Sequence, residues 1–185
     1  MDQNTRQRIL ATAKEMAQEH GISGVSFREV AARIGIKSAS VHYHFPAKND
    51  LMLALVRMQR EETAAALDTI GSGGDFHSRM RAFIALFRHH LEHGNRFCLC
   101  GMMGAEMAGL PDAAREELAS FFDMCAQWVA AQIVAFGPAA GIDPGALGRL
   151  FVASVEGAML VSRVKGHVAS FDEAVNAQLY LLTCD

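Results

Sequence analysis

Features that mark membrane and secreted proteins are missing from this sequence of 185 residues. It has no uninterrupted run of 18 apolar residues, roughly the minimum for a membrane-spanning helix. The most apolar stretch, residues 124–142, is broken by Gln127, Gln132 and Pro138. The opening residues, MDQNTRQRIL, are polar and charged, so we expect no signal peptide. These absences argue against a membrane protein.

Disulfide and enzyme signatures are missing as well. The cysteines, at positions 98, 100, 125 and 184, do not form the pattern of a disulfide framework, which predicts a reduced, cytoplasmic protein. The sequence contains no nucleophile elbow, P-loop, glycine-rich dinucleotide turn or HExxH motif. An enzyme site would have to be built from Glu106, Glu156 and the histidines. We therefore expect no enzyme activity and no cofactor.

No segment alternates apolar and polar residues, as a strand does, more clearly than it repeats apolar residues at helical spacing. The sequence therefore predicts an all-α fold. Hydrophobic residues make up 51% of the chain and charged residues 20%, which allows a sizeable core. The charge is uneven: residues 1–50 hold 7 Lys+Arg and 5 Asp+Glu, a net +2, and the rest of the chain carries −5. A mildly basic head on an acidic body is typical of a small DNA-binding domain attached to a larger domain that does not touch DNA.

Apolar residues recur at helical spacing through most of the chain. On the first predicted helix, Ile9, Leu10, Ala13, Met16 and Ala17 form one stripe. The clearest break is the sequence GSGG at 71–74. The predicted helices cover 5–20, 26–34, 38–45, 46–70, 76–92, 99–107, 112–136, 145–164 and 171–182, with a loop at 137–144.

The most specific local pattern lies between the first helix and the long fourth one. Ser26 is a typical N-cap, Glu29 completes a capping box, and Gly35 permits the positive φ that ends a helix. In the short helix that follows, Val41 and Phe45 are four residues apart and point inward. A short helix, a glycine and a second short helix occur in many helical proteins. The same order also makes a helix-turn-helix, which places a helix in the DNA major groove.

The side chains on the other face of that second helix favour DNA binding. Lysine supplies a point charge for phosphate, and serine, tyrosine and histidine donate to phosphate oxygens or base acceptors. Ala39 permits close approach to a thymine methyl group. A tyrosine between two histidines is an unusual choice for a surface that meets only water. The predicted DNA-binding residues are Ser26, Arg28, Lys37, Ser38, Ala39, Ser40, His42, Tyr43, His44 and Lys48.

Five short patterns run through residues 5–55: Arg6-x-x-Ile9-Leu10-x-x-Ala13, Phe27-x-x-Val30-Ala31, Ile34-Gly35-Ile36, Ser40-Val41-x-Tyr43-His44-Phe45 and Lys48-x-x-Leu51. In these patterns the segment resembles the DNA-binding domain of the TetR family of transcriptional regulators. Two positions depart from the family pattern: His42 stands where tyrosine or phenylalanine is usual, and Phe27 where threonine is common. The resemblance implies a three-helix DNA-binding domain over 1–48 and a helical ligand-binding and dimerisation domain over 49–185.

The helix at 145–164 is apolar around most of its circumference, which predicts burial on more than one side. Burial in the core of one chain is the simpler explanation. A homodimer interface shared with 112–136 as a four-helix bundle is the other. The resemblance favours the dimer, because the two penultimate long helices of TetR-family proteins usually form the interface. Gly157 and Ala158 are small enough for a second backbone to approach.

Residues 96–111, RFCLCGMMGAEMAGLP, resemble more loosely the ligand domain of a TetR subgroup that includes regulators of small organic compounds and electrophiles. Methionine and aromatic side chains can line an adaptable apolar cavity, although filling of the core explains each one alone. Glu106, if buried, needs a partner, for which Arg88, His89, His90 or the ligand is available. The predicted pocket residues are Phe83, Phe87, Met103, Glu106, Met107 and Trp128.

Cys98 and Cys100 are candidate sensor thiols, with Arg96 nearby to stabilise a thiolate. The alternative is that both are small apolar residues. Two positions apart on a helix they would face away from each other, which argues against a shared metal ion. His89 and His93 have the spacing of a chelating pair, but no third ligand matches them, so we expect no metal site.

Together these features predict a sequence-specific, DNA-binding homodimer. The simplest version is a repressor that a small-molecule or electrophile effector releases from double-stranded operator DNA. Two alternatives stay open: a regulator whose sensor is a thiol, and a dimeric small-molecule binder that no longer binds DNA.

Overall fold

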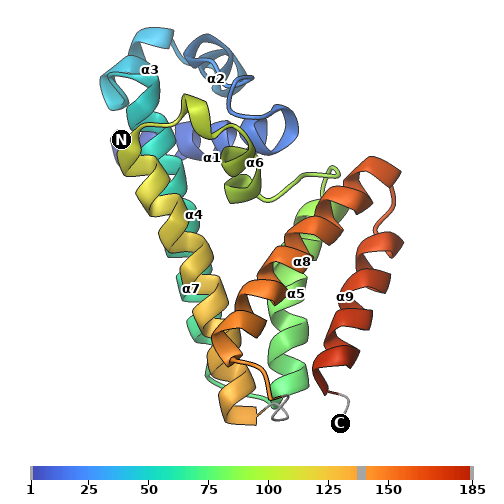
Figure 1. Ribbon diagram of the computed structural model, residues 1–185. Coiled ribbons are helices and arrows are strands. Elements are labelled where there is room, and N and C mark those ends of the chain that lie inside the picture. The colour runs from blue at the N-terminus through green and yellow to red at the C-terminus, as the bar shows by residue number, and fades with distance from the viewer. Residues whose placement is uncertain (1, 137–140, 184–185) are drawn as a thin grey trace. The chain divides into compact units, whose positions relative to one another are not determined.

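The computed structural model describes residues 2–136 and 141–183, and within these ranges the regular secondary structure is helical, which confirms the all-α prediction (Figure 1). The predicted bounds 76–92 and 112–136 agree with the structure, whereas the fourth helix begins at Lys48, two residues after the predicted start at Pro46. Part of the loop predicted at 137–144 lies outside the described residues. The elements are α1 (Asp2–His20), α2 (Phe27–Ile34), α3 (Ser38–His44), α4 (Lys48–Gly71), α5 (Phe76–Glu92), α6 (Leu99–Ala105), the 3-10 turn η1 (Met107–Gly109), α7 (Asp112–Phe136), α8 (Pro144–Lys165) and α9 (Ala169–Thr183).

The helices form two compact units. Unit 1 comprises Met1–Glu61 and Leu99–Ala119, and unit 2 comprises Glu62–Cys98 and Ser120–Asp185. The borders fall inside α4 and α7, so each of these two helices contributes to both units. The sequence-based division after residue 48 stays a prediction. The segment Leu99–Ala119 belongs to the same compact unit as the first three helices, from which it is distant in sequence.

The first three helices form a head within unit 1, in which α1 packs against α2 and α3 (Figure 1). Its core is the predicted apolar stripe of α1, all five members of which are buried. Val41 and Phe45 are buried as predicted, which fixes α3 on this core. The guanidinium of Arg8 donates a 2.7 Å hydrogen bond to the carbonyl of Ile34, and Arg6 lies over the Phe45 ring at 5.1 Å.

The ends of α2 follow the predicted capping pattern. The hydroxyl of Ser26 accepts a hydrogen bond from the Glu29 backbone N–H at 3.2 Å and donates one to the Glu29 carboxylate at 2.8 Å. This arrangement satisfies an N–H that has no partner inside the helix. Gly35 ends the helix with φ +73°. A short turn follows and connects α2 directly to α3.

Unit 2 is built on α5, α8 and α9, which pack against one another (Figure 1). The buried phenylalanines Phe83, Phe151 and Phe171 each come from a different one of these helices. Arg88 on α5 donates to both oxygens of Asp172 on α9, at 2.8 and 3.0 Å, in a two-pronged ion pair. These contacts hold the three helices together.

By length and composition alone, α7 over Asp112–Ala135 and α8 could each cross a membrane. Less than half of the apolar window of each helix, 39% in α7 and 44% in α8, is buried inside the chain.

Glu156 on α8 is a buried carboxyl group in unit 2. Neither of its side-chain oxygens meets the geometry of a full hydrogen bond, and the thiol of Cys98 lies beside the carboxyl group. Burial, and then the nearby thiol of Cys98, raise the pKa of Glu156 well above its ordinary value. The same burial raises the pKa of the Cys125 thiol, whose surroundings include Cys98 and Glu156. A buried polar group without a full hydrogen bond costs stability, on the order of 1–3 kcal/mol.

Because of this carboxyl group, we expect the free energy of unfolding to fall as pH rises. Above the ordinary glutamate pKa the unfolded chain loses the Glu156 proton while the folded chain keeps it, so the folded state binds more protons. Relative to Glu156→Gln, we expect the free energy of unfolding of the wild type to fall by up to about 1.4 kcal/mol per pH unit between about pH 5 and 7. Denaturant titrations at several pH values measure this. The exposed Glu116→Gln is the control, and parallel pH profiles for wild type and Glu156→Gln would contradict the assignment.

Candidate nucleic-acid interface

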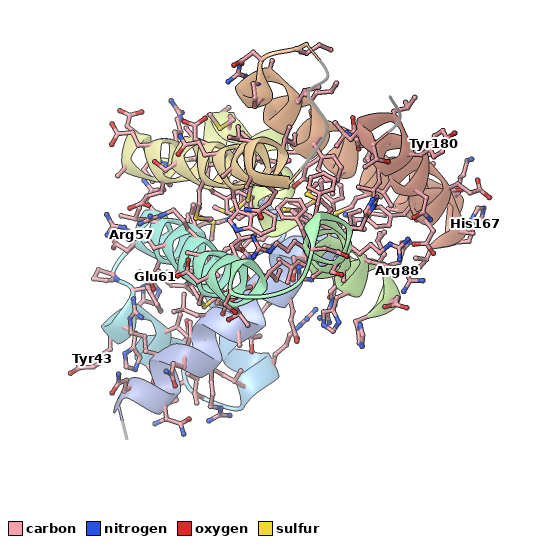
Figure 2. All side chains as sticks on the ribbon, turned by 90° about the horizontal axis from the view of Figure 1, so that it is seen from below. Tyr43, Arg57, Glu61, Arg88, His167 and Tyr180 are labelled. Atoms are coloured by element: carbon pink, nitrogen blue, oxygen red, sulfur yellow. The ribbon has the colours of Figure 1, made fainter. Side chains whose placement is uncertain are left out.

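The predicted DNA-binding side chains lie on α3, at its N-terminal end and at the flanking ends of α2 and α4. Tyr43 is 74% exposed and projects outward from α3 (Figure 2). Lys37 is the N-cap of α3, and Lys48 is the first residue of α4, so two cations flank the helix. Of the predicted set, Arg28, Lys37, Ala39, His42, Tyr43 and Lys48 are exposed, and Ser26, Ser38, Ser40 and His44 are partly exposed.

The two positions that depart from the family pattern contact each other. The rings of Phe27 and His42 meet edge to face with centroids 4.7 Å apart. Phe27 therefore holds the orientation of the His42 ring on the exposed side of α3. Phe27 is not among the predicted DNA-binding residues. Phe27 and His42 both depart from the family pattern and lie on helices that pack together, and this is the sequence signal that could have indicated their contact.

Glu106 lies elsewhere than the sequence analysis expected. The prediction that Arg88, His89 or His90 is the partner of its carboxylate is wrong. The carboxylate accepts hydrogen bonds from the backbone N–H groups of Ile22 and Ser23, at 2.9 and 3.0 Å. Both donors belong to the turn between α1 and α2, so Glu106 contacts the head rather than α5.

The predicted pocket residues are divided between the two units. In unit 2, Phe83 stacks on Trp128 at 5.6 Å with nearly parallel rings, and also contacts Phe87 at 5.2 Å and Phe151 at 6.0 Å. The sequence analysis did not include Phe151. The indole N–H of Trp128 donates to the Leu67 carbonyl at 3.2 Å. The other three predicted residues belong to unit 1, with Met103 buried, Glu106 partly exposed and Met107 exposed.

The candidate sensor thiols are both inside the protein. Cys98 is 4% exposed and Cys100 is fully buried, and neither forms a disulfide. Reactive thiols are normally accessible, so this burial favours the interpretation of both as small apolar residues. Among the described residues, no cluster of three or more His, Cys, Asp or Glu side chains could hold a metal ion.

An apolar face is exposed along α8 and α9. On α8 it comprises Leu150, Gly157, Leu160, Val161 and Val164, whose spacings are close to whole turns of a helix apart from the adjacent pair 160–161, so it runs along one side of the helix. Tyr180, whose side chain points outward in Figure 2, and Leu181 are exposed on α9, which packs against α8. Ala158, expected to face a second chain, is 7% exposed because it packs inside its own chain. Gly157 is the exposed small residue at this point.

Comparison with known proteins agrees with both halves of this arrangement. Residues 9–55 match the family model of bacterial regulatory proteins of the tetR family. Residues 77–177, more than half of the chain, match the model of the C-terminal domain of LmrA/YxaF-like transcriptional regulators. The family models thus cover the head and most of the remaining helices.

Individual relatives point the same way. The transcriptional regulator AcuR of Cereibacter sphaeroides is 29% identical over 168 residues, which span 86% of this chain and 76% of AcuR. A TetR-family regulator from Agrobacterium tumefaciens has a similar structure, with a TM-score of 0.92, 27% identity and full coverage of both chains. A TetR regulator from Legionella pneumophila matches with a TM-score of 0.89 and 27% identity, covering 97% of this chain and 98% of the other. The chain belongs to the TetR family of transcriptional regulators.

Proposed function

We propose that this protein is a repressor that binds operator DNA as a homodimer and leaves it when an effector binds. The observation that carries the proposal is the exposed surface of α3, on which Tyr43 stands between His42 and His44 and is flanked by Lys37 and Lys48. The lysines suit phosphates, and the ring side chains suit base edges and phosphates. The α3 helix would enter the major groove.

We place the dimer interface on α8 and α9. An apolar face exposed along a helix is normally covered by a partner, and a two-fold dimer brings the same face of two chains together. The sequence analysis chose 112–136 as the second interface helix. The exposed apolar residues Tyr180 and Leu181 favour α9 instead. A dimer gives two recognition helices, which double the length of DNA that is read.

We place the effector site in unit 2, at the aromatic cluster around Phe83 and Trp128. Aromatic side chains are typical of sites for small organic ligands. The larger domain, residues 49–185, would then bind effector and form the dimer, and the head would bind DNA. An effector that favours the DNA-free state weakens DNA binding, and DNA weakens effector binding by the same factor.

The two alternatives have less support. A thiol sensor requires a cysteine that reagents can reach, and Cys98, Cys100 and Cys125 are all buried. A small-molecule binder without DNA binding would not need the exposed α3 surface. Free thiols accord with a reduced compartment, and we place the protein in the cytoplasm.

A first prediction tests the α3 surface. Tyr43→Ala and Lys48→Ala should weaken operator binding while helicity and oligomeric state stay unchanged, because both side chains are exposed. Lys48→Ala should also reduce the slope of log affinity against log salt concentration by about one, as for one lost phosphate contact. Gel shifts at several salt concentrations measure both effects. Arg81→Ala removes an exposed cation from α5 and serves as the charge control. Unchanged operator affinity in both Tyr43→Ala and Lys48→Ala would refute the assignment of this surface to DNA binding.

A second prediction tests the interface. Leu160→Glu places a charge in the middle of the exposed face of α8 and should shift the protein from dimer to monomer, with loss of operator binding. Sedimentation velocity measures the state of assembly. The control, Ala85→Glu, introduces the same charge at an exposed position of α5 and should stay dimeric. A monomeric wild type at micromolar concentration would rule out the dimer.

A third prediction separates the thiol sensor from the pocket. Cys184 lies outside the described residues, so the test uses the Cys184→Ser variant. Because the other three thiols are buried, N-ethylmaleimide should modify the folded protein slowly and the denatured protein fast. Mass spectrometry of timed samples, with gel shifts of the same samples, gives both readouts. Rapid modification of Cys98 or Cys100 with release of DNA would favour the thiol sensor.

A further inference from the structure

Glu106 joins two parts of unit 1 that are far apart in sequence. It follows α6, and its two carboxylate oxygens each accept one backbone hydrogen bond from the turn between α1 and α2, at 2.9 Å from Ile22 and 3.0 Å from Ser23. These partners lie 84 and 83 residues away along the chain. Helices α1 and α6 also pack against each other (Figure 1). The carboxylate therefore ties the head to the segment Leu99–Ala119.

The turn is shaped to receive this carboxylate. Gly21, the residue before the two donors, has φ +82°, a conformation that disfavours side chains. A Cβ at this position would lie 2.0 Å from Oε1 of Glu106. Glycine thus provides both the turn and the space for the carboxylate. Ile22 is buried, so the turn is packed as well as hydrogen-bonded.

Two adjacent N–H donors pointing at one side chain require two acceptors. A carboxylate supplies both, whereas a glutamine amide supplies one and turns its NH2 group toward the other donor. Hydrogen bonds to a charged acceptor are also stronger than neutral ones. The exchange of Glu106 for glutamine therefore removes one of the two hydrogen bonds and the charge on the other acceptor, while the size of the side chain stays almost unchanged.

A second carboxylate fixes the same segment to α4. Glu117 accepts hydrogen bonds from Nε of Arg57 at 2.8 Å and from Nε of Arg60 at 2.9 Å. The hydrogen bond from Arg57 and the charges of both arginines lower the pKa of Glu117. The segment that carries Glu106 is thus itself held on α4, so Glu106 holds the α1–α2 turn from a fixed position.

We infer that Glu106 is a positioning residue for operator binding: by holding the α1–α2 turn on the segment Leu99–Ala119, it fixes the direction in which α3 faces. This inference rests on the proposed function. A two-fold dimer must present its recognition helices roughly one helical turn of DNA apart, about 34–36 Å. If the head can pivot, it loses orientational entropy when the dimer binds both half-sites, and this loss weakens operator binding. Glu106 is not among the predicted DNA-binding residues, so its effect on operator binding would be exerted through the position of the head.

The test compares three DNA duplexes. They are the palindromic operator mapped with wild-type protein in the DNA upstream of its own coding sequence, the same operator with two base pairs inserted between the half-sites, and a scrambled duplex. For Glu106→Gln we expect operator affinity to fall on the order of tenfold, the scale of one lost charge-assisted hydrogen bond. Affinity for the scrambled duplex should not change. The penalty for the two inserted base pairs should shrink, because a looser head adapts to altered spacing.

Two further variants make the outcome decisive. Glu116→Gln removes an exposed carboxylate from the same segment and should behave as the wild type on all three duplexes. Gly21→Ala displaces the carboxylate from the head side and should reproduce Glu106→Gln, which covers the case in which the latter does not fold. Unchanged operator affinity and spacing penalty in a folded Glu106→Gln would overturn the inference. An equal loss on operator and scrambled DNA would also overturn it. A wild type without a preferred site would instead refute the proposed function.

Discussion

The arrangement of unit 1 depends on one carboxylate that binds two neighbouring backbone N–H groups. Without Glu106, the turn after α1 would lose its hydrogen bonds from Ile22 and Ser23 to the segment Leu99–Ala119, and the packing of α1 on α6 would remain as the contact between them. Gly21 keeps the space open, and Glu117 anchors the other end of the segment on Arg57 and Arg60. These contacts set the direction of the α3 surface.

Much of the fold could be predicted from the sequence because it depends on near neighbours. The stripe of α1, the Ser26 cap and the Gly35 turn each involve residues within a few positions of one another. The start of α5 follows from a local cap, because the Asp75 side chain accepts a hydrogen bond from the Ser78 backbone N–H. The exposed face of α3 follows in turn, because two buried residues, Val41 and Phe45, determine which side remains.

Contacts between distant residues could not be predicted in the same way. The pattern around Glu106 indicates a carboxylate beside apolar residues but not the Ile22 and Ser23 donors, which are more than eighty positions away. An apolar helix does not reveal which of its faces is buried in its own chain, so Ala158 was misassigned. The buried carboxyl of Glu156 also appears only once α8 is packed.

If Glu106 restricts the orientation of the head in the dimer, its removal widens the range of distances between the two heads. The most direct measurement is pulsed electron paramagnetic resonance between two copies of a spin label at Ala32→Cys, an exposed position on α2 outside the predicted DNA contacts. Labels on Ala32→Cys with Cys184→Ser should give one narrow distance distribution. Adding Glu106→Gln should broaden that distribution while the dimer persists. Distributions of equal width with and without Glu106→Gln would contradict the account.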